Sequence, residues 1–181
     1  MTVPTAVATG ATVWFTGLPS AGKTTLATAL AAELHRPVEL LDGDEVREFL
    51  SKGLGFGRAD RDTNVLRIGW VAATLARHGV LVLASVISPF AQTRAQVRDL
   101  HTERGAGFVE VHVATPVDVC SRRDVKGLYA RQATGELTGL TGVDAPYEVP
   151  LSPEAVVHTH EQSLAESVTQ VLTLLRDRGL A

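Results

Sequence analysis

The sequence predicts an α/β fold, with a five-stranded parallel sheet flanked by helices and a lid segment over about residues 122–150. Three observations support this prediction. Short apolar runs alternate along the chain with stretches of helical spacing. A glycine-rich loop joins the first apolar run to the first helical stretch. Residues 123–153 contain four glycines and three prolines, and an irregular segment of that length is usually functional.

The expected strands are short apolar runs rich in β-branched residues. In chain order they are Thr12–Thr16, Val38–Leu41, Val80–Val86, Phe108–Val113 and Ala155–His158. The run from Val80 is the most apolar of them. We expect it near the middle of the sheet, because central parallel strands are covered on both faces.

The expected helices carry apolar residues at intervals of three and four. They are Lys23–His35, Asp44–Leu50, Asp62–His78, Ala91–Arg104, Val117–Arg122 and Glu161–Arg178. Residues 51–60 are rich in glycine and small residues and are expected to form a loop. Trp14 and Trp70 lie in apolar patterns and are expected in the core. The apolar side of the last helix could pack on the sheet or on a second subunit.

The composition fits one ordinary globular domain over residues 1–181. The net charge of −3 argues against binding of nucleic acid through bulk electrostatics. The single cysteine, Cys120, excludes an internal disulfide and is expected to be a buried thiol. His158 and His160 are close in sequence, but no third metal ligand is evident beside them.

The chain has no run of about 18 apolar residues, so no membrane span is expected. The first 15 residues have no basic segment before their apolar stretch, so no signal peptide is expected. We therefore expect a cytoplasmic protein without nucleic-acid or membrane partners. We also expect a homodimer.

The segment GLPSAGKT, from Gly17 to Thr24, matches the phosphate-loop (P-loop) pattern G-x-x-x-x-G-K-[ST]. It follows an expected strand and opens an expected helix, where backbone N–H groups and the helix N-terminus attract phosphate. Lys23 is expected to reach the β- and γ-phosphates of ATP, and Thr24 to bind Mg²⁺. The predicted ATP-binding residues of the loop are Gly17, Leu18, Pro19, Ser20, Ala21, Gly22, Lys23, Thr24 and Thr25. The motif leaves the reaction open.

Two aspartates, Asp42 and Asp44, follow the second expected strand. Ligands of open α/β sheets bind beyond the carboxyl ends of the strands. Carboxylates there can hold Mg²⁺ through water or accept a proton from an attacking hydroxyl. Both aspartates are therefore candidate metal ligands, and Asp44 is also a candidate catalytic residue. The alternative is that either one only caps the following helix.

Three polar side chains beyond this turn, Arg47, Arg61 and Asn64, suit a multidentate anionic ligand. The alternative for them is a solvated, charged loop. Ser88 follows the third expected strand. It could bind phosphate, receive phosphate, or stabilise a turn before Pro89.

Several segments together resemble the adenylylsulfate kinases, a family of P-loop NTPase-type kinase domains. They are GLPSAGKTT (17–25), LDGDEVR (41–47), GFGRADRDTN (55–64), VISPF (86–90), FVEVHV (108–113), CSRRDVKGLYARQATGELTGLTGVDAPYE (120–148) and PLSPE (150–154). The resemblance implies strand order 2-3-1-4-5. It also implies transfer of the ATP γ-phosphate to the 3′-hydroxyl of adenosine-5′-phosphosulfate (APS), with Mg²⁺ as the metal.

The resemblance implies roles for individual residues as well. Asp44 is placed near the attacking 3′-hydroxyl. The implied APS-binding residues are Asp44, Arg47, Phe56, Arg61, Asn64, Ile87, Ser88, Lys126, Gly139 and Leu140. Ser88 matches a serine described in the family as a phosphoserine intermediate, although direct in-line transfer needs no such step. Arg123 is implied to stack on the ATP adenine or to touch its phosphates, and Lys126 to meet the anionic groups as the lid closes.

Three positions depart from the family pattern. Ser20 stands for a usual glycine, Thr63 for a common glutamate, and Leu140 for a usual phenylalanine beside the APS adenine. The last change removes an aromatic stacking contribution of about 0.5–1.5 kcal/mol. Two alternatives therefore stay open. One is a P-loop kinase for another small hydroxyl acceptor, and the other is a non-catalytic nucleotide-binding partner in sulfate activation.

Overall fold

A computed structural model of the chain describes residues 10–181. The expectation that the first 15 residues hold no signal peptide falls mostly outside these residues. All strands of the sheet run parallel, in the predicted order β2-β3-β1-β4-β5. Their bounds are β1 Ala11–Thr16, β2 Val38–Asp42, β3 Leu81–Ser85, β4 Gly107–Val113 and β5 Ala155–Val157. The prediction of the sheet is confirmed, with boundaries shifted by at most one residue.

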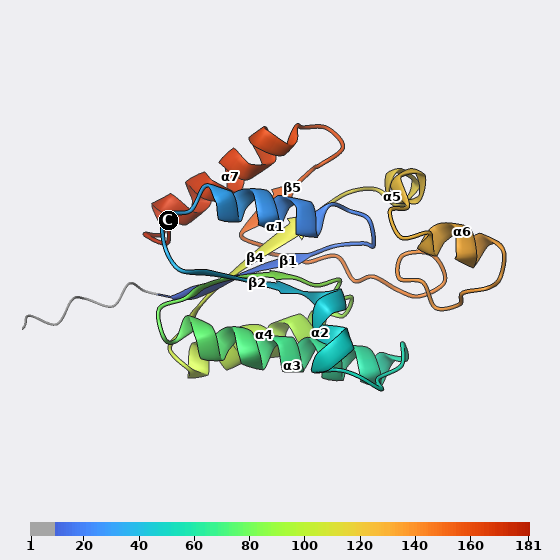
Figure 1. Cartoon of the computed structure of the whole chain (residues 1–181), viewed down its shortest axis with the longest axis horizontal. Coiled ribbons are helices and arrows are strands. Elements are labelled where there is room, and N and C mark those ends of the chain that lie inside the picture. The colour runs from blue at the N-terminus through green and yellow to red at the C-terminus, as the bar shows by residue number, and fades with distance from the viewer. Residues whose placement is uncertain (1–9) are drawn as a thin grey trace, which may run out of the picture.

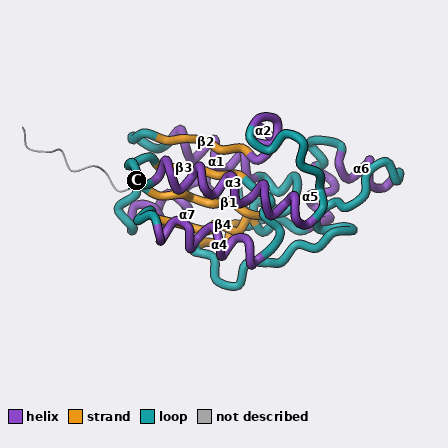
Figure 2. Tube along the Cα trace, turned by 90° about the horizontal axis from the view of Figure 1, so that it is seen from below, coloured by secondary structure: helices purple, strands orange, loops and turns teal. Residues whose placement is uncertain are grey.

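Helices cover both faces of the sheet, with α1 and α7 on one side and α3 and α4 on the other (Figure 1). The helix bounds are α1 Lys23–Ala32, α2 Gly43–Phe49, α3 Arg58–Ala76, α4 Ala91–Glu103, α5 Val117–Arg123, α6 Leu128–Ala133 and α7 Leu164–Asp177. Both views place α5 and α6 at the opposite end of the molecule from the C-terminus (Figures 1 and 2). None of the helices within residues 10–181 has the length and apolarity needed to cross a bilayer.

The core forms two layers because alternate residues of β1 point to opposite faces. Val13 and Phe15 are fully buried in the larger cluster, together with Val171 and Leu175 of α7. Trp14 is fully buried in the second cluster, against α3. The apolar side of α7 therefore packs on the core of its own chain, which answers the question that its sequence left open.

Two predictions, on the start of α3 and on the burial of Trp70, were wrong. Helix α3 begins at Arg58 rather than at Asp62. Asp60 lies in its first turn, where the helix dipole favours a negative charge. Trp70 is 51% exposed, beneath the guanidinium of Arg104 at 5.0 Å from its ring centroid. Its place in an apolar stretch did not predict burial, because only one side of α3 faces the sheet.

Helix α6 lies inside the predicted lid and was not expected. The carboxylate of Asp124 accepts hydrogen bonds from the backbone N–H groups of Tyr129 and Ala130, both at 3.0 Å. A side chain four residues before the helix thus satisfies donors of its first turn, a capping arrangement that a periodicity search does not detect.

Candidate active site

A cavity of about 600 Å³ lies between the phosphate loop, the carboxyl ends of the strands and the lid. This is a usual size for a small-molecule site. The predicted site residues that line it are Pro19, Ser20, Gly22, Lys23, Thr24, Thr25, Asp42, Asp44, Arg47, Phe56, Arg61, Asn64, Ile87, Ser88, Arg123, Lys126, Gly139 and Leu140. Gly17, Leu18 and Ala21 are not in this lining set, and their carbonyl groups bond within the protein.

Lys23 is the buried cation of the phosphate loop. Its Nζ donates hydrogen bonds to the carbonyl oxygens of Gly17, at 2.9 Å, and Leu18, at 2.7 Å. Burial is the main cause that lowers the pKa of Lys23 to about 8; the charge of Lys126 acts in the same direction, whereas Cys120 and Asp42 oppose the shift. The loop therefore holds a desolvated ammonium that gains from an added anion.

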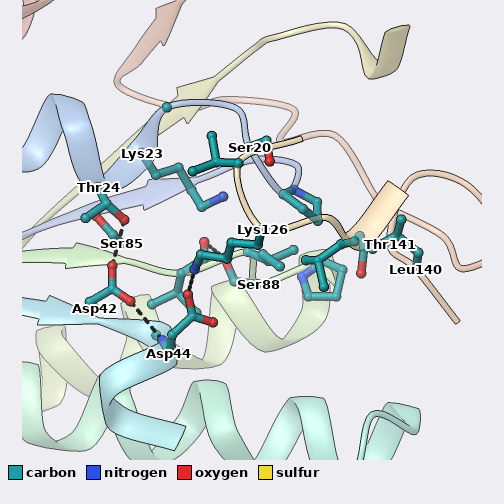
Figure 3. A pocket seen from close by; sticks show the side chains of 18 of the residues that line it. Ser20, Lys23, Thr24, Asp42, Asp44, Ser85, Ser88, Lys126, Leu140 and Thr141 are labelled. Carbon is teal, nitrogen blue, oxygen red and sulfur yellow. Dashed lines mark hydrogen bonds and ion pairs between the residues drawn. The ribbon is translucent and has the colours of Figure 1, made fainter. Parts of the chain in front are cut away.

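The loop around Lys23 adopts backbone conformations that favour glycine. Gly22 has φ 103°, and Ser20 has φ 59° although it carries a side chain. A left-handed serine costs on the order of 1 kcal/mol relative to glycine. Ser20 thus keeps the loop shape at a small cost, and its side chain lies beside the cavity (Figure 3).

The oxygen atoms of Thr24 and Asp42 lie together below the loop. Thr24 Oγ1 donates to Asp42 Oδ2 at 2.6 Å, and Asp42 Oδ1 accepts from the backbone N–H of Asp44 at 2.9 Å (Figure 3). Asp42 is thereby the N-cap of α2. A hydroxyl and a carboxylate in contact are the donor set that Mg²⁺ prefers, so these residues fit a magnesium ion.

Asp44 projects its carboxylate into the cavity and forms an ion pair with Lys126 of the lid (Figure 3). Its side chain is 67% exposed and that of Lys126 is 56% exposed. Because Asp42 serves as the helix cap, the carboxylate of Asp44 is left for the cavity. The pair links the lid to the acidic turn.

Two arginines surround the ring of Phe56 on another wall. The guanidinium carbons of Arg47 and Arg61 lie 4.5 and 5.9 Å from the ring centroid. Burial lowers the pKa of both arginines, and the charge of Arg47 lowers that of Arg61 further. Arg61 donates to the carbonyl of Gly139 at 2.6 Å and to the hydroxyl of Thr141 at 2.5 Å, so it also ties α3 to the lid.

Asn64 lines the same region and is 6% exposed. Its Oδ1 is buried and has no hydrogen-bond partner among residues 10–181. A buried acceptor without a partner is costly, and a ligand hydroxyl or amino group would relieve that cost.

Ser88 has a buried hydroxyl. Trp14 Nε1 donates to Ser88 Oγ at 3.0 Å, and Ser88 Oγ donates to Thr16 Oγ1 at 2.9 Å. The residue is 1% exposed and has φ 41°. Both roles of the hydroxyl are thus taken by protein groups, which favours a structural part for this side chain over attack on phosphate.

Thr159 is a cavity residue that the sequence analysis missed. Its Oγ1 and carbonyl oxygen accept hydrogen bonds from Arg123 at 3.0 and 2.9 Å, and its hydroxyl also contacts the carbonyl of Ala21 at 2.9 Å. It follows β5 closely, so the rule that ligands gather at the carboxyl ends of strands could have found it.

The structure also adds a third polar group to the two neighbouring histidines. Possible ligand atoms of His158, His160 and Glu161 all lie within 4.8 Å of one another on the surface. His160 Nε2 lies 3.2 Å from Glu161 Oε1. Glu161, which directly follows His160 in sequence, is therefore a candidate third ligand that was overlooked in the sequence.

Comparison with known proteins agrees with this geometry. A family model described as adenylylsulphate kinase matches residues 9–158. The adenylyl-sulfate kinase of Myxococcus xanthus (strain DK1622) is 53% identical over 173 residues, covering 94% of each chain. That of Synechococcus sp. (strain JA-3-3Ab) is 53% identical, covering 94% of this chain and 96% of its own.

Among solved structures, a Mycobacterium tuberculosis APS kinase in complex with AMPPNP and APS has a TM-score of 0.90 and 42% identity. The match covers 93% of this chain and 99% of that one. The family model, the relatives and the structure thus agree over nearly the whole length. The chain belongs to the adenylylsulfate kinase family.

Proposed function

We propose that the protein is an adenylylsulfate kinase, which transfers the γ-phosphate of ATP to the 3′-hydroxyl of APS. The products are ADP and 3′-phosphoadenylyl sulfate. One observation carries the proposal. A single cavity brings the phosphate loop together with the Asp44 carboxylate, which projects into it and pairs with Lys126, and with two arginines suited to a second anion.

On the donor side, the backbone of residues 17–25 surrounds the ATP phosphates. Lys23 leaves the carbonyls of its own loop and binds the β- and γ-phosphate oxygens, where its charge offsets the charge that develops during transfer. Thr24 and Asp42, with Asp44 through water, would hold Mg²⁺. When bound, the ion would supply positive charge beside the phosphates. Arg123, fixed by Thr159, lies against the adenine or the phosphates.

On the acceptor side, Asp44 orients the 3′-hydroxyl and accepts its proton. The new bond joins that oxygen to the γ-phosphorus, and the bond from the γ-phosphorus to the β–γ bridging oxygen breaks. Arg47, Arg61 and Asn64 hold the phosphosulfate group. The APS adenine lies between Phe56 and the lid residues Gly139 and Leu140, with Ile87 beside it.

Lys126 and Ser88 have supporting parts in this scheme. The Lys126 ammonium exchanges Asp44 for ligand oxygens when the two substrates bind, which frees the carboxylate and brings the lid over the cavity. A closed lid excludes water and so limits hydrolysis of ATP. Ser88 is not phosphorylated, because its hydroxyl is buried and bonded on both sides.

The experiment is an acceptor panel. ADP release from ATP is measured with APS, with a nucleoside monophosphate and with small alcohols, using wild type and the Lys23→Ala variant. Among the acceptors, we expect only APS to cause ADP release. In Lys23→Ala the rate of ADP release should fall by at least about a hundredfold, while the circular dichroism spectrum stays native. Faster turnover with another acceptor would replace APS. Tight ATP binding without turnover on any acceptor would favour the non-catalytic alternative.

Other features belong to the same proposal. We propose a single domain over residues 1–181 that acts in the cytoplasm as a homodimer, and sedimentation equilibrium tests the dimer directly.

A further inference from the structure

Arg94 is a buried arginine of α4 with a function beyond ordinary packing. It is 3% exposed, and its Nε lies 2.8 Å from Glu110 Oε1. Its Nη1 donates to the carbonyl of Ser88 and its Nη2 to the carbonyl of Glu148, both at 2.7 Å. A buried guanidinium is costly unless its donors are bonded, so these three contacts constrain one another.

The two carbonyl groups belong to different parts of the cavity wall. Ser88 lies in the acceptor loop, which we define as residues 87–89, and all three of its residues line the cavity. Glu148 lies at the end of the lid, 54 positions along the chain from Arg94. One guanidinium therefore joins the acceptor loop to the point where the lid returns to the domain.

Further contacts close the same arrangement. The N–H of Glu148 donates to the carbonyl of Pro89 at 2.8 Å, and Glu148 Oε2 accepts from the N–H of Ala91 at 2.7 Å. Tyr147 lies over the Arg94 guanidinium at 5.9 Å, and its hydroxyl lies 3.0 Å from Thr16 Oγ1. We call Arg94, Tyr147 and Glu148 the lid clamp.

The clamp acts on a strained backbone. Ser88 has φ 41°, a left-handed conformation that residues with a side chain avoid. Such a conformation persists where the surroundings hold it, and it is typical of functional sites. Here the hold consists of the Arg94 bond to the Ser88 carbonyl and the Trp14 and Thr16 bonds to its hydroxyl.

We propose that Arg94 is a positioning residue for the acceptor. It holds the acceptor loop in its left-handed form and fixes the returning end of the lid against it, although Arg94 itself is not one of the described residues that line the cavity. This inference rests on the proposed function. Without the clamp, the acceptor loop relaxes. The phosphate loop keeps its shape, because the contacts of Arg94 described here do not reach it.

Arg98 is a matched control one turn further along α4. It pairs with Glu154 at 2.7 Å and with Glu110 at 3.4 Å, so it shares the ion-pair network. None of its hydrogen bonds within the described part of the chain reaches the acceptor loop or Glu148. A change at Arg98 therefore perturbs the network without the clamp.

The test compares Arg94→Lys with Arg98→Lys. Lysine keeps the charge opposite Glu110 but cannot bond both carbonyls in the fork geometry of arginine. We expect Arg94→Lys to raise the KM for APS roughly tenfold or more, with the KM for ATP nearly unchanged and acceptor-independent ATP hydrolysis increased. Arg98→Lys should leave both constants near wild type. Equal changes in both KM values, or the same profile in both variants, would overturn the proposal.

Two further readouts keep the test decisive. Hydrogen exchange should quicken in residues 87–91 and 145–149 of Arg94→Lys but not of Arg98→Lys, whatever the acceptor; unchanged exchange would overturn the clamp. If Arg94→Lys does not fold, Tyr147→Phe takes its place, because it loses only the bond to Thr16. This variant should also raise the KM for APS, and an unchanged KM would overturn the proposed lid clamp. If the wild-type enzyme did not turn over APS, the proposed function would be contradicted. The hydrogen-exchange comparison would still test the lid clamp.

Discussion

Leu140 stands where the family resemblance implies a phenylalanine, and the proposed function places it beside the APS adenine. The side chain is 5% exposed, lines the cavity and packs in the main core. An aliphatic side chain there replaces stacking on the APS adenine by ordinary packing.

Leu140→Phe should therefore tighten APS binding by roughly twofold to tenfold, which corresponds to one aromatic pair. Because the site is well packed, the larger ring should also lower thermal stability. Calorimetric titration of APS in the presence of a non-hydrolysable ATP analogue gives the Kd. Leu151→Phe adds the same volume at a 97% exposed position just after the lid, outside the described cavity lining, and serves as the control. An unchanged Kd in Leu140→Phe would mean that the pocket beside residue 140 holds something other than the adenine.

Single residues differ in how well their sequence context predicts them. The expected place of Lys23 followed from a local motif, and Asp44 from its position after a strand. Arg94 gave no such signal, because its role depends on contacts with residues far away in sequence. Thr159 was overlooked although it follows β5, as Asp44 follows β2. The buried state of the Ser88 hydroxyl likewise depends on Trp14, 74 positions away.

Among the elements, the phosphate loop with α1 gives a pH-dependent prediction. Burial lowers the pKa of Lys23 to about 8, so in the free enzyme its amine is charged below pH 8 and neutral above it. ATP needs the charged form. The affinity for ATP should stay nearly constant from pH 7 to 8 and then fall, approaching tenfold per pH unit.

Titration of ATP without APS from pH 7 to 9.5 measures this dependence. Adenosine, which has no phosphates, is the control and should bind equally across the range. The neighbouring thiol of Cys120 does not produce the effect below pH 9, because burial raises its pKa. An ATP affinity that is the same at pH 7 and 9.5 would show that Lys23 is not the group that titrates.

Elements with strong periodicity were predicted within a few residues, whereas those defined by side-chain capping were not. β1 and β3 are fully buried apolar runs, and strands covered on both faces leave a clear pattern. Helix α6 depends on the Asp124 carboxylate, and α3 begins earlier than its apolar pattern because Gly57 precedes a polar first turn. Neither helix start is marked by apolar spacing.

At the scale of the whole molecule, the parallel topology brings the site together. The strand order places β1, which leads into the phosphate loop, beside β3, which leads into the acceptor loop. Their carboxyl ends meet at one edge, and the lid crosses that edge from Arg123 to the clamp at Glu148 (Figure 1). The sequence predicted this meeting of strand ends, but the two attachment points of the lid became visible only in the structure.

The central claim is direct transfer of phosphate between two ligands in this cavity. ATP labelled at its γ-phosphorus is incubated with APS and the enzyme, and the label is followed in nucleotide products, free phosphate and protein. We expect label in the 3′-phosphate of 3′-phosphoadenylyl sulfate and none on Ser88. Label found mainly in free phosphate or held on the protein would contradict it.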